Sequence, residues 1–190
     1  MNEPLTPFQP TGPYPQVMLD VPTGMAIPLS ADARGERVTI AGRLLDGAGQ
    51  PVFDAMIETW QPDANGRFPH PADPRAADAD PGFWGYRRVA TDTNGRFHID
   101  TVKPGSIRDP EGPVADLHAP HIVIGIYGGG ILYRYVTRLY FADEPANASD
   151  QVMQQVPAER RATLIASRDG NVYRFDIRLQ GERETVFFDV

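Results

Sequence analysis

The sequence predicts a mainly β protein: an antiparallel β-sandwich with long loops, an extended N-terminal arm and at most one or two short helices. Short segments of alternating apolar and polar residues recur between Gly, Asp and Asn turns, which is typical of such sandwiches. Gly and Pro account for 18 and 19 of the 190 residues, a content that favours turns over helices. Residues 150–162 have a helical pattern, but Pro157 interrupts it.

Residues 1–35 differ from the rest of the chain and are predicted to form an extended arm, followed by a β-sandwich domain over residues 36–190. Prolines recur from Pro4 to Pro28, and each proline fixes φ and removes a backbone donor. The arm also carries apolar side chains such as Phe8 and Met18. Because an exposed apolar segment of this length is a liability, we expect the arm to dock on another surface.

Four strand pairs are predicted in chain order, each from the turn-forming residues between its two strands. They are residues 37–45 with 52–60, 86–91 with 96–101, 121–127 with 131–141, and 163–168 with 172–180, and a last strand is predicted over 185–189. Two long loops, residues 61–85 and 103–120, separate these segments. Loops of this length in a compact domain usually carry function or form an interface.

Composition excludes several classes of function. The net charge of −7 argues against a nucleic-acid partner, because phosphate binding needs a basic surface. The absence of cysteine excludes a disulfide scaffold, a zinc ribbon and a thiol nucleophile. No apolar run is long enough to span a bilayer and no signal-peptide pattern is visible at the N-terminus, so we expect no membrane contact and a cytoplasmic location.

The residues alone show no complete active site. Histidines occur at His70, His98, His118 and His121. Alternation along residues 96–101 predicts that His98 faces solvent. His118 and His121 have no further soft ligand nearby, so they do not by themselves predict a metal site. Glu58 lies within a strand pattern, and we interpret it as a half-buried carboxylate satisfied by an arginine.

Seven segments, spread from Gln9 to Asp189, carry a more specific signal. They read Gln-Pro-Thr-Gly-Pro-Tyr at 9–14, Glu-Thr-Trp-Gln-Pro-Asp-Ala-Asn-Gly at 58–66, Val-Lys-Pro-Gly at 102–105, Ala-Pro-His-Ile at 119–122, Thr-Arg-Leu-Tyr-Phe at 137–141, Tyr-Arg-Phe-Asp-Ile at 173–177 and Glu-Thr-Val-Phe-Phe-Asp at 184–189. In this order the segments resemble the intradiol ring-cleavage dioxygenases, and among these the α-chain type of the two-chain protocatechuate 3,4-dioxygenases.

The resemblance implies an Fe(III)-dependent reaction of O2 with 3,4-dihydroxybenzoate that opens the ring between the two oxygenated carbons and gives 3-carboxy-cis,cis-muconate. It also implies a higher-order hetero-oligomer with a homologous β chain that holds the iron through two tyrosinates and two histidines. Phenolate oxygens are hard ligands that suit ferric iron, and imidazoles complete the site.

In this chain the four ligand positions implied by the resemblance are Phe68, Ile107, His121 and Val123. Three of them have no donor atom in the side chain. The resemblance therefore implies no catalytic residue and no metal ligand in this chain, with Fe(III) held by the partner β chain. His121 is then expected to be a hydrogen-bonded interior residue.

The resemblance also implies that Thr11, Gly12, Pro13 and Tyr14 line the substrate pocket at the partner's active site. Gly12 permits close backbone approach, Pro13 stiffens the arm, and Tyr14 offers a ring and a hydroxyl. The family's arginine near residues 127–131 is absent here, where Gly128-Gly129-Gly130 stands. Either the partner chain or Arg134 meets the substrate carboxylate, or the chain's enzyme prefers another catechol; the sequence leaves these alternatives open.

Two alternatives compete with this interpretation. The segment over residues 38–52 also resembles transthyretin-like and carboxypeptidase-regulatory domains, which would make the chain a noncatalytic β-sandwich binding module. The second alternative is an iron enzyme that needs no partner chain. It would take its four ligands from a set of six tyrosine and histidine residues, and nothing in the sequence places these residues together. That set is Tyr86, Tyr127, Tyr133, Tyr135, His118 and His121.

Overall fold

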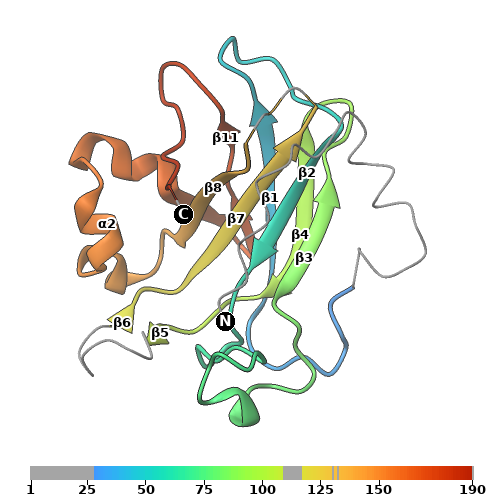
Figure 1. Ribbon diagram of the computed structural model, residues 1–190, viewed down its shortest axis with the longest axis vertical. Helices are drawn as coiled ribbons and strands as arrows, with labels where there is room; N and C mark the ends of the chain where they lie inside the picture. The colour runs from blue at the N-terminus through green and yellow to red at the C-terminus, as the bar shows by residue number, and fades with distance from the viewer. Residues whose placement is uncertain (1–27, 109–116, 130, 132, 190) are drawn as a thin grey trace, which may run out of the picture.

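The computed structural model describes residues 28–108, 117–129, 131 and 133–189 of the chain (Figure 1). These residues form eleven strands, of which nine join into one sheet and β5 and β6 form a separate pair. The strands are β1 Arg37–Leu45, β2 Ala55–Trp60, β3 Tyr86–Ala90, β4 Arg96–Val102, β5 Ile107–Arg108, β6 Leu117–His118, β7 His121–Gly128, β8 Tyr135–Phe141, β9 Ile165–Asp169, β10 Val172–Arg174 and β11 Ile177–Arg178. The prediction of a mainly β fold is confirmed.

The large sheet is mixed rather than purely antiparallel, which corrects the prediction. Its strands follow the order β11-β1-β10-β9-β8-β7-β2-β3, and β4 pairs with the other edge of β1. The pairs β1–β10, β1–β11 and β8–β9 are parallel. The turn over residues 92–95 joins β3, which ends this order next to β2, to β4, which lies beyond β1 at the opposite edge of the sheet. The sheet therefore curves round and nearly closes like a barrel.

Two of the four predicted strand pairs are confirmed and two are wrong. The pairs β7–β8 and β9–β10 are antiparallel hairpins, as predicted. The first segment meets the second only at the predicted turn, where Leu45 forms an isolated antiparallel bridge with Pro51 and Val52 N donates to Leu44 O. Beyond the turn the two separate, because β4 and β10 occupy the two edges of β1, and β2 lies between β3 and β7. The third and fourth segments are joined by the predicted turn, but β3 pairs with β2 and β4 pairs with β1.

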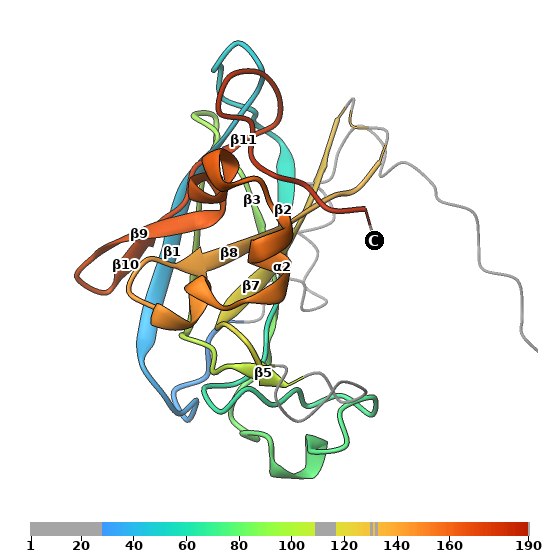
Figure 2. The ribbon, with the colours of Figure 1, turned by 90° about the vertical axis from the view of Figure 1, so that its left-hand side faces the viewer.

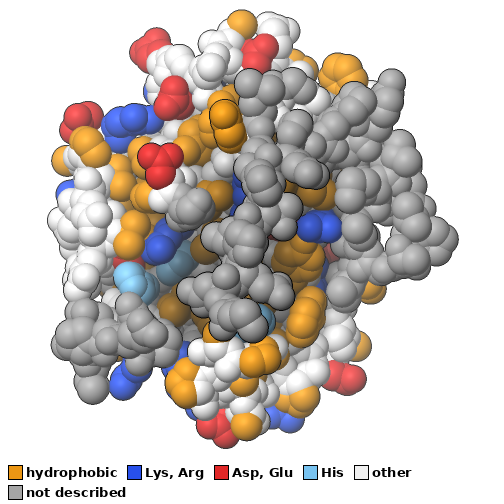
Figure 3. Space-filling model, viewed as in Figure 1, with side chains coloured by type: hydrophobic (Ala, Val, Ile, Leu, Met, Phe, Trp, Pro, Cys, Tyr) orange, Lys and Arg blue, Asp and Glu red, His pale blue; other side chains and the backbone are white. Residues whose placement is uncertain are grey.

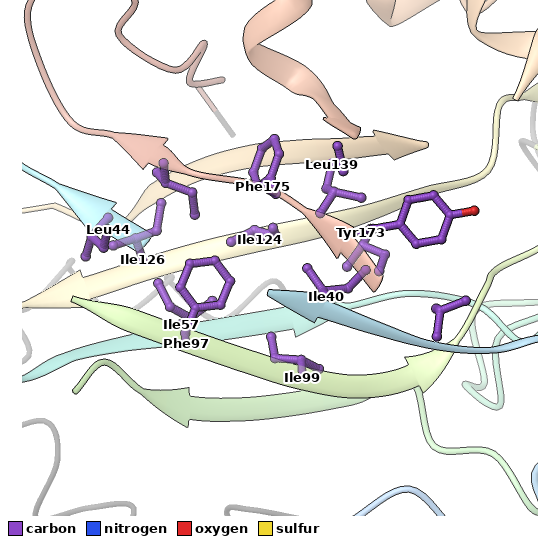
Figure 4. Close-up of a cluster of buried hydrophobic side chains, with 14 of the residues drawn as sticks. Ile40, Leu44, Ile57, Phe97, Ile99, Ile124, Ile126, Leu139, Tyr173 and Phe175 are labelled. Atoms are coloured by element: carbon purple, nitrogen blue, oxygen red, sulfur yellow. The ribbon is translucent and has the colours of Figure 1, made fainter. Parts of the chain in front are cut away.

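The core lies inside the curved sheet, where alternate residues of each strand point inward (Figure 4). In β7 these residues are Ile122, Ile124 and Ile126, each at most 1% exposed. Phe97 of β4 and Phe175 pack against the same cluster from other parts of the sheet. Burial of these branched and aromatic side chains supplies most of the free energy that holds the sheet closed.

The helical segment predicted over residues 150–162 is present and is broken at the proline, as expected. Asp150 caps α2 Gln151–Gln155 by accepting from Met153 N, and the 3-10 helix η3 Ala158–Leu164 begins after Pro157. Figure 2 shows this segment packed on the outside of β8, where Tyr140, Met153 and Leu164 form a second buried cluster. Two further 3-10 helices are described, η1 Ala76–Asp78 and η2 Pro145–Ala148.

Residues 185–189 run alongside β8 without forming the predicted strand. Thr137 Oγ1 donates to Val186 O at 2.7 Å, and Phe188 N donates to Val136 O at 2.8 Å. These isolated bonds replace a regular ladder. None of the helices in the described part of the chain is long and apolar enough to cross a membrane.

Candidate functional site

The two long loops come together at one end of β2 and β7, at the bottom of Figure 1. Asp63 N is fixed by Arg67 O, and Asp63 O accepts a hydrogen bond from Gly105 N at 3.0 Å, which joins the first loop to the second. The contact depends on glycine, because a Cβ atom on Gly66 would lie 1.9 Å from Ser106 O. The sequence therefore builds a compact loop layer over this end of the sheet.

Phe68 lies in this layer against the last residue of β2. Its ring stacks on Trp60 with centroids 5.4 Å apart and an interplanar angle of 15°. Trp60 pairs with Val123 of β7 across the sheet, so Phe68 and Val123 flank the same tryptophan. The Phe68 amide is held by Asp73 Oδ2 at 3.0 Å.

Ile107 and His121 lie at the adjoining part of the same end. Ile107 pairs with His118 between β5 and β6, and the rings of His118 and His121 contact edge to face with centroids 6.2 Å apart. The structure thus brings together all four positions that the resemblance identifies. Figure 3 shows histidine side chains grouped on this face beside a basic side chain.

His121 is the interior, hydrogen-bonded histidine that we expected. It is 4% exposed, and its Nδ1 lies 2.8 Å from Ala119 O. Because a carbonyl oxygen only accepts, Nδ1 carries the proton. Burial, with the nearby Arg138 as a smaller cause, lowers the pKa of His121 to about 4. The ring is therefore neutral at neutral pH.

Asp150 organises the polar groups next to His121, a role that the sequence analysis missed. Its carboxylate is fully buried and accepts from Ala119 N at 2.9 Å and from the Tyr140 hydroxyl at 3.0 Å, in addition to the cap on α2. His118 Nδ1 lies 3.4 Å from Asp150 Oδ2, an electrostatic contact. These bonds hold the pKa of Asp150 below its usual value although burial opposes them. An Asp directly before a helical segment was the available signal.

The donor set at this site does not fit a ferric ion. Phe68, Ile107 and Val123 have no side-chain donor atom, which leaves His121 alone among the four positions. The neighbouring Tyr140 keeps its proton, because burial and then Asp150 raise the pKa of its hydroxyl. Among the described residues, no group of three or more His, Asp or Glu side chains is arranged to hold a metal ion.

Glu58 is the strand carboxylate satisfied by arginine that the sequence predicted. Its Oε2 accepts from the Tyr86 hydroxyl at 2.6 Å and from two nitrogens of Arg88 at 2.8 and 3.0 Å. Arg134 lies 3.2 Å from Glu58 Oε1 and fills the space above Gly125, where a Cβ atom would come within 2.8 Å of the Arg134 side chain. Arg134, one candidate for binding the substrate carboxylate, is therefore paired with Glu58 in this structure.

Two of the remaining candidates contact Trp60 at this end: the ring centroids of His70 and Tyr86 lie 6.2 and 6.4 Å from that of Trp60. His98 is exposed, as predicted. Tyr86 and Tyr127, two members of the alternative ligand set, have raised pKa values, for which burial is the main cause and Glu58 contributes. The positions Thr11, Gly12, Pro13 and Tyr14 fall outside the described residues, so their predicted contact with substrate stays a prediction.

Comparison with known proteins defines the class of this protein. Residues 23–181 match the family described as Dioxygenase, and the chain belongs to the intradiol ring-cleavage dioxygenase family. Its fold is also that of the 3-chlorocatechol 1,2-dioxygenase of Rhodococcus opacus 1CP, with a TM-score of 0.64 at 23% identity, covering 91% of this chain and 69% of that one.

Within this family, the chain is similar to one subunit type in particular. It is 45% identical over 201 residues to the protocatechuate 3,4-dioxygenase α chain of Burkholderia cepacia, covering 97% of both chains. It is also 37% identical over 160 residues to the β chain from the same organism, covering 80% of this chain and 67% of that one. A match over nearly the full length favours this family over a transthyretin-like binding module.

Proposed function

We propose that this chain is the α subunit, without iron, of a cytoplasmic protocatechuate 3,4-dioxygenase. The enzyme cleaves 3,4-dihydroxybenzoate with O2 to 3-carboxy-cis,cis-muconate. The carbon–carbon bond between the two hydroxylated carbons breaks, and each of these carbons gains one oxygen atom of O2 to become a carboxylate. Both electron pairs come from the ring, so no external reductant is needed.

One observation supports the assignment of the iron to the partner chain rather than to this one. The end of the sheet where the family positions gather offers Phe68, Ile107 and Val123, and its His121 and Tyr140 are already bonded to Ala119 O and Asp150. This supports a partner β chain as the holder of Fe(III). The near-full-length similarity to the α chain and the weaker similarity to the β chain support a hetero-oligomer of two related chains.

We assign to Thr11, Gly12, Pro13 and Tyr14 the task of lining the substrate pocket in that assembly. A glycine lets the arm backbone approach the substrate, and the proline beside it limits the conformations that the arm loses on docking. Tyr14 supplies a flat apolar surface with a hydroxyl at its edge. No bond of the reaction is assigned to a residue of this chain.

Iron content and kinetics test the proposal. This chain and its β partner, co-expressed, should purify as one complex with one iron per pair of chains, whereas this chain alone should bind no stoichiometric iron. Deletion of residues 1–14 should raise KM for 3,4-dihydroxybenzoate about tenfold or more while leaving the iron content unchanged. The matched variant Tyr14→Phe, which removes only the hydroxyl, should raise KM by less.

Two results would contradict the proposal. Iron and ring-cleaving activity in this chain without a partner would move the active site into it. Loss of iron from the complex on deletion of residues 1–14, with KM unchanged in the remaining active fraction, would make the arm a support for the metal site rather than a wall of the substrate pocket.

A further inference from the structure

A groove of about 520 Å³ lies where the curved sheet fails to close, between β3 and β4. The two strands are neighbours in Figure 1, yet β3 pairs with β2 and β4 pairs with β1. The walls of the groove include Arg87 and Val89 from β3 and Ile99 and Thr101 from β4. The groove thus lies over side chains of the inner face, of which Arg87, Ile99 and Thr101 are buried.

Arg87 is a buried cation without a carboxylate partner among the described residues. It is 6% exposed, and its Nη1 donates only to the carbonyl oxygens of Trp84 and Tyr86. Its guanidinium also lies over the Phe83 ring at 5.9 Å. Burial lowers the pKa of Arg87, as expected for a cation whose charge is not compensated nearby.

The other edge of the same guanidinium has no hydrogen-bond acceptor in the described part of the chain. Arg87 Nε is buried and unpaired, and Nη2 beside it is unpaired but not fully buried. These two nitrogens form the side-on fork that matches the two oxygens of a carboxylate. Buried donors without a partner are rare in native proteins, and each needs an explanation.

A second unpaired group lies opposite the first. Thr59 of β2 pairs with Arg87 across the sheet, and its Oγ1 is also buried without a partner among the described residues. The comparable threonine of β4, Thr101, donates to Gln61 Oε1 at 2.8 Å. Two adjacent unpaired polar groups on one inner face indicate an acceptor that the described part of the chain does not supply.

The rest of the groove combines positive charge with apolar walls. Arg37, Arg88 and His98 also line it, and Asp100 is the carboxylate among its lining residues. Asp100 accepts from the Thr39 hydroxyl at 2.7 Å, and Arg88 is paired with Glu58. Val38, Val89 and Ile99 supply the apolar surface. This lining suits a planar anion with an apolar body better than a compact polyanion such as phosphate.

We propose that the β3–β4 groove binds a small carboxylate with an apolar body, with Arg87 Nε and Nη2 as the donors to its two oxygens. One carboxylate oxygen binds Nη2, which is accessible from the groove. The other oxygen binds the buried Nε and displaces water from it. Val89 and Ile99 of the groove contact the apolar body. Thr59, which pairs with Arg87 across the sheet and does not itself line the groove, contributes its hydroxyl to the carboxylate that reaches Nε.

Calorimetric titration of the full-length chain with benzoate tests the site, with benzamide as the neutral analogue of the same shape. The chain is used without a partner so that no other subunit contributes. We expect one saturable benzoate site per chain and at least tenfold weaker binding of benzamide, because a hydrogen-bonded charge contributes about 1.5–3 kcal/mol. Arg87→Lys retains the charge and a donor for Trp84 O but removes the fork, and should weaken benzoate at least tenfold.

Two further variants keep the test decisive. Thr59→Val should weaken benzoate severalfold without removing any bond seen in the structure, so it serves even where Arg87 variants fold poorly. Arg96→Gln removes an exposed cation from β4 outside this groove and should leave the affinity unchanged.

Equal binding of benzoate and benzamide, unchanged binding in both Arg87→Lys and Thr59→Val, or no saturable benzoate site would overturn the proposal. The last result would assign the unpaired nitrogens to ordered water. Where the chain alone is not soluble, equilibrium dialysis of the co-expressed complex gives the same answer: wild type should bind one more benzoate per copy of this chain than the Thr59→Val and Arg87→Lys complexes.

Discussion

Two regions of the molecule differ in how they treat buried polar groups. At the end of β7, where the family positions gather, the chain completes most of its own bonds: His121 bonds to Ala119 O, and Tyr140 bonds to Asp150, while the buried His118 Nδ1 has only an electrostatic contact with Asp150. In the β3–β4 groove, Arg87 Nε and Thr59 Oγ1 have no partner among the described residues. The first region, which we call the closed region, offsets its buried polar groups with carboxylate and carbonyl oxygens of its own chain, whereas the groove places no carboxylate of the described residues beside Arg87 and is where an external acceptor is expected.

The same contrast occurs within a single strand. Arg87 and Arg88 are consecutive in β3, so their side chains lie on opposite faces of the sheet. Arg88 faces Glu58 across the β2–β3 pair and forms two hydrogen bonds with it. Arg87 faces Thr59, which brings no charge. Two neighbouring positions of one strand therefore hold an arginine whose charge is balanced by a carboxylate and an arginine whose charge is not.

The largest expected effect concerns the closed region. The pKa of His121 falls from the ordinary 6.5 to about 4 in the folded chain, so between these pH values the unfolded chain binds a proton that the folded chain does not. Stability therefore rises with pH through this window and is lost as pH falls from about 6.5 to 4, by up to about 3 kcal/mol. Below pH 4 both states are protonated and this loss stops.

Urea denaturation of wild type and His121→Gln at pH 7, 5.5 and 4.5 measures this contribution as the difference between the two pH profiles. Asp150 and His118 also face this ring, but both remain in the variant. The control His98→Gln changes an exposed histidine and should keep the wild-type profile. A His121→Gln profile parallel to that of wild type would show that the closed region does not hold a neutral histidine.

The second prediction concerns Glu58, the carboxylate that Arg88 has and Arg87 lacks among the described residues. Glu58→Gln keeps the shape of the side chain but leaves Arg88 and Arg134 without their carboxylate. Breaking a buried ion pair costs about 3–5 kcal/mol. We expect about 2 kcal/mol here, because the arginine side chains are 23% and 36% exposed while Glu58 is 9% exposed.

The control for this variant is Asp176→Asn, which breaks the pair with Arg43. Both of those side chains are about half exposed, at 51% and 49%, and such pairs contribute about 0.5 kcal/mol or less. Chemical denaturation compares the two variants directly. Equal losses of stability in both would mean that Glu58 does not neutralise a buried charge, and the contrast between the two arginines would fail.

The sequence predicts the segments of this fold better than their partners. Alternation and turn residues locate β1, β4 and β7, because both signals are local. The β1–β2 hairpin was predicted wrongly because β1 instead pairs in parallel with β10, which places Ile40 beside Tyr173. That choice depends on packing between residues more than 130 positions apart, which no local pattern encodes.

The candidate site shows the same division. Family resemblance located Phe68, Ile107, His121 and Val123, and alternation with composition identified Glu58 as an arginine-paired carboxylate. Neither signal indicates that Asp150 reaches back to Ala119 and Tyr140, or that Arg87 Nε lacks an acceptor among the described residues. Both facts depend on which strands and loops meet in three dimensions, and a charged residue in a strand pattern has the same appearance whether or not it is compensated.

The smallest expected effect compares two buried threonines directly. Thr59 and Thr101 are 2% and 1% exposed and both lie in strands. Only Thr101 has a partner among the described residues, through its bond to Gln61. Replacement by valine keeps the shape and the β propensity of each residue. Thr101→Val should therefore cost about 1–2 kcal/mol because it leaves the buried Gln61 oxygen unpaired.

Thr59→Val should be neutral or stabilise the ligand-free chain by up to about 0.5 kcal/mol, since it removes a hydroxyl whose burial is not offset by a bond. Urea denaturation of the two variants without added carboxylate gives both values. A loss above about 1 kcal/mol in Thr59→Val would reveal a partner for this hydroxyl in the free protein, such as an ordered water. The groove would then resemble the closed region, with its polar groups satisfied before any ligand arrives.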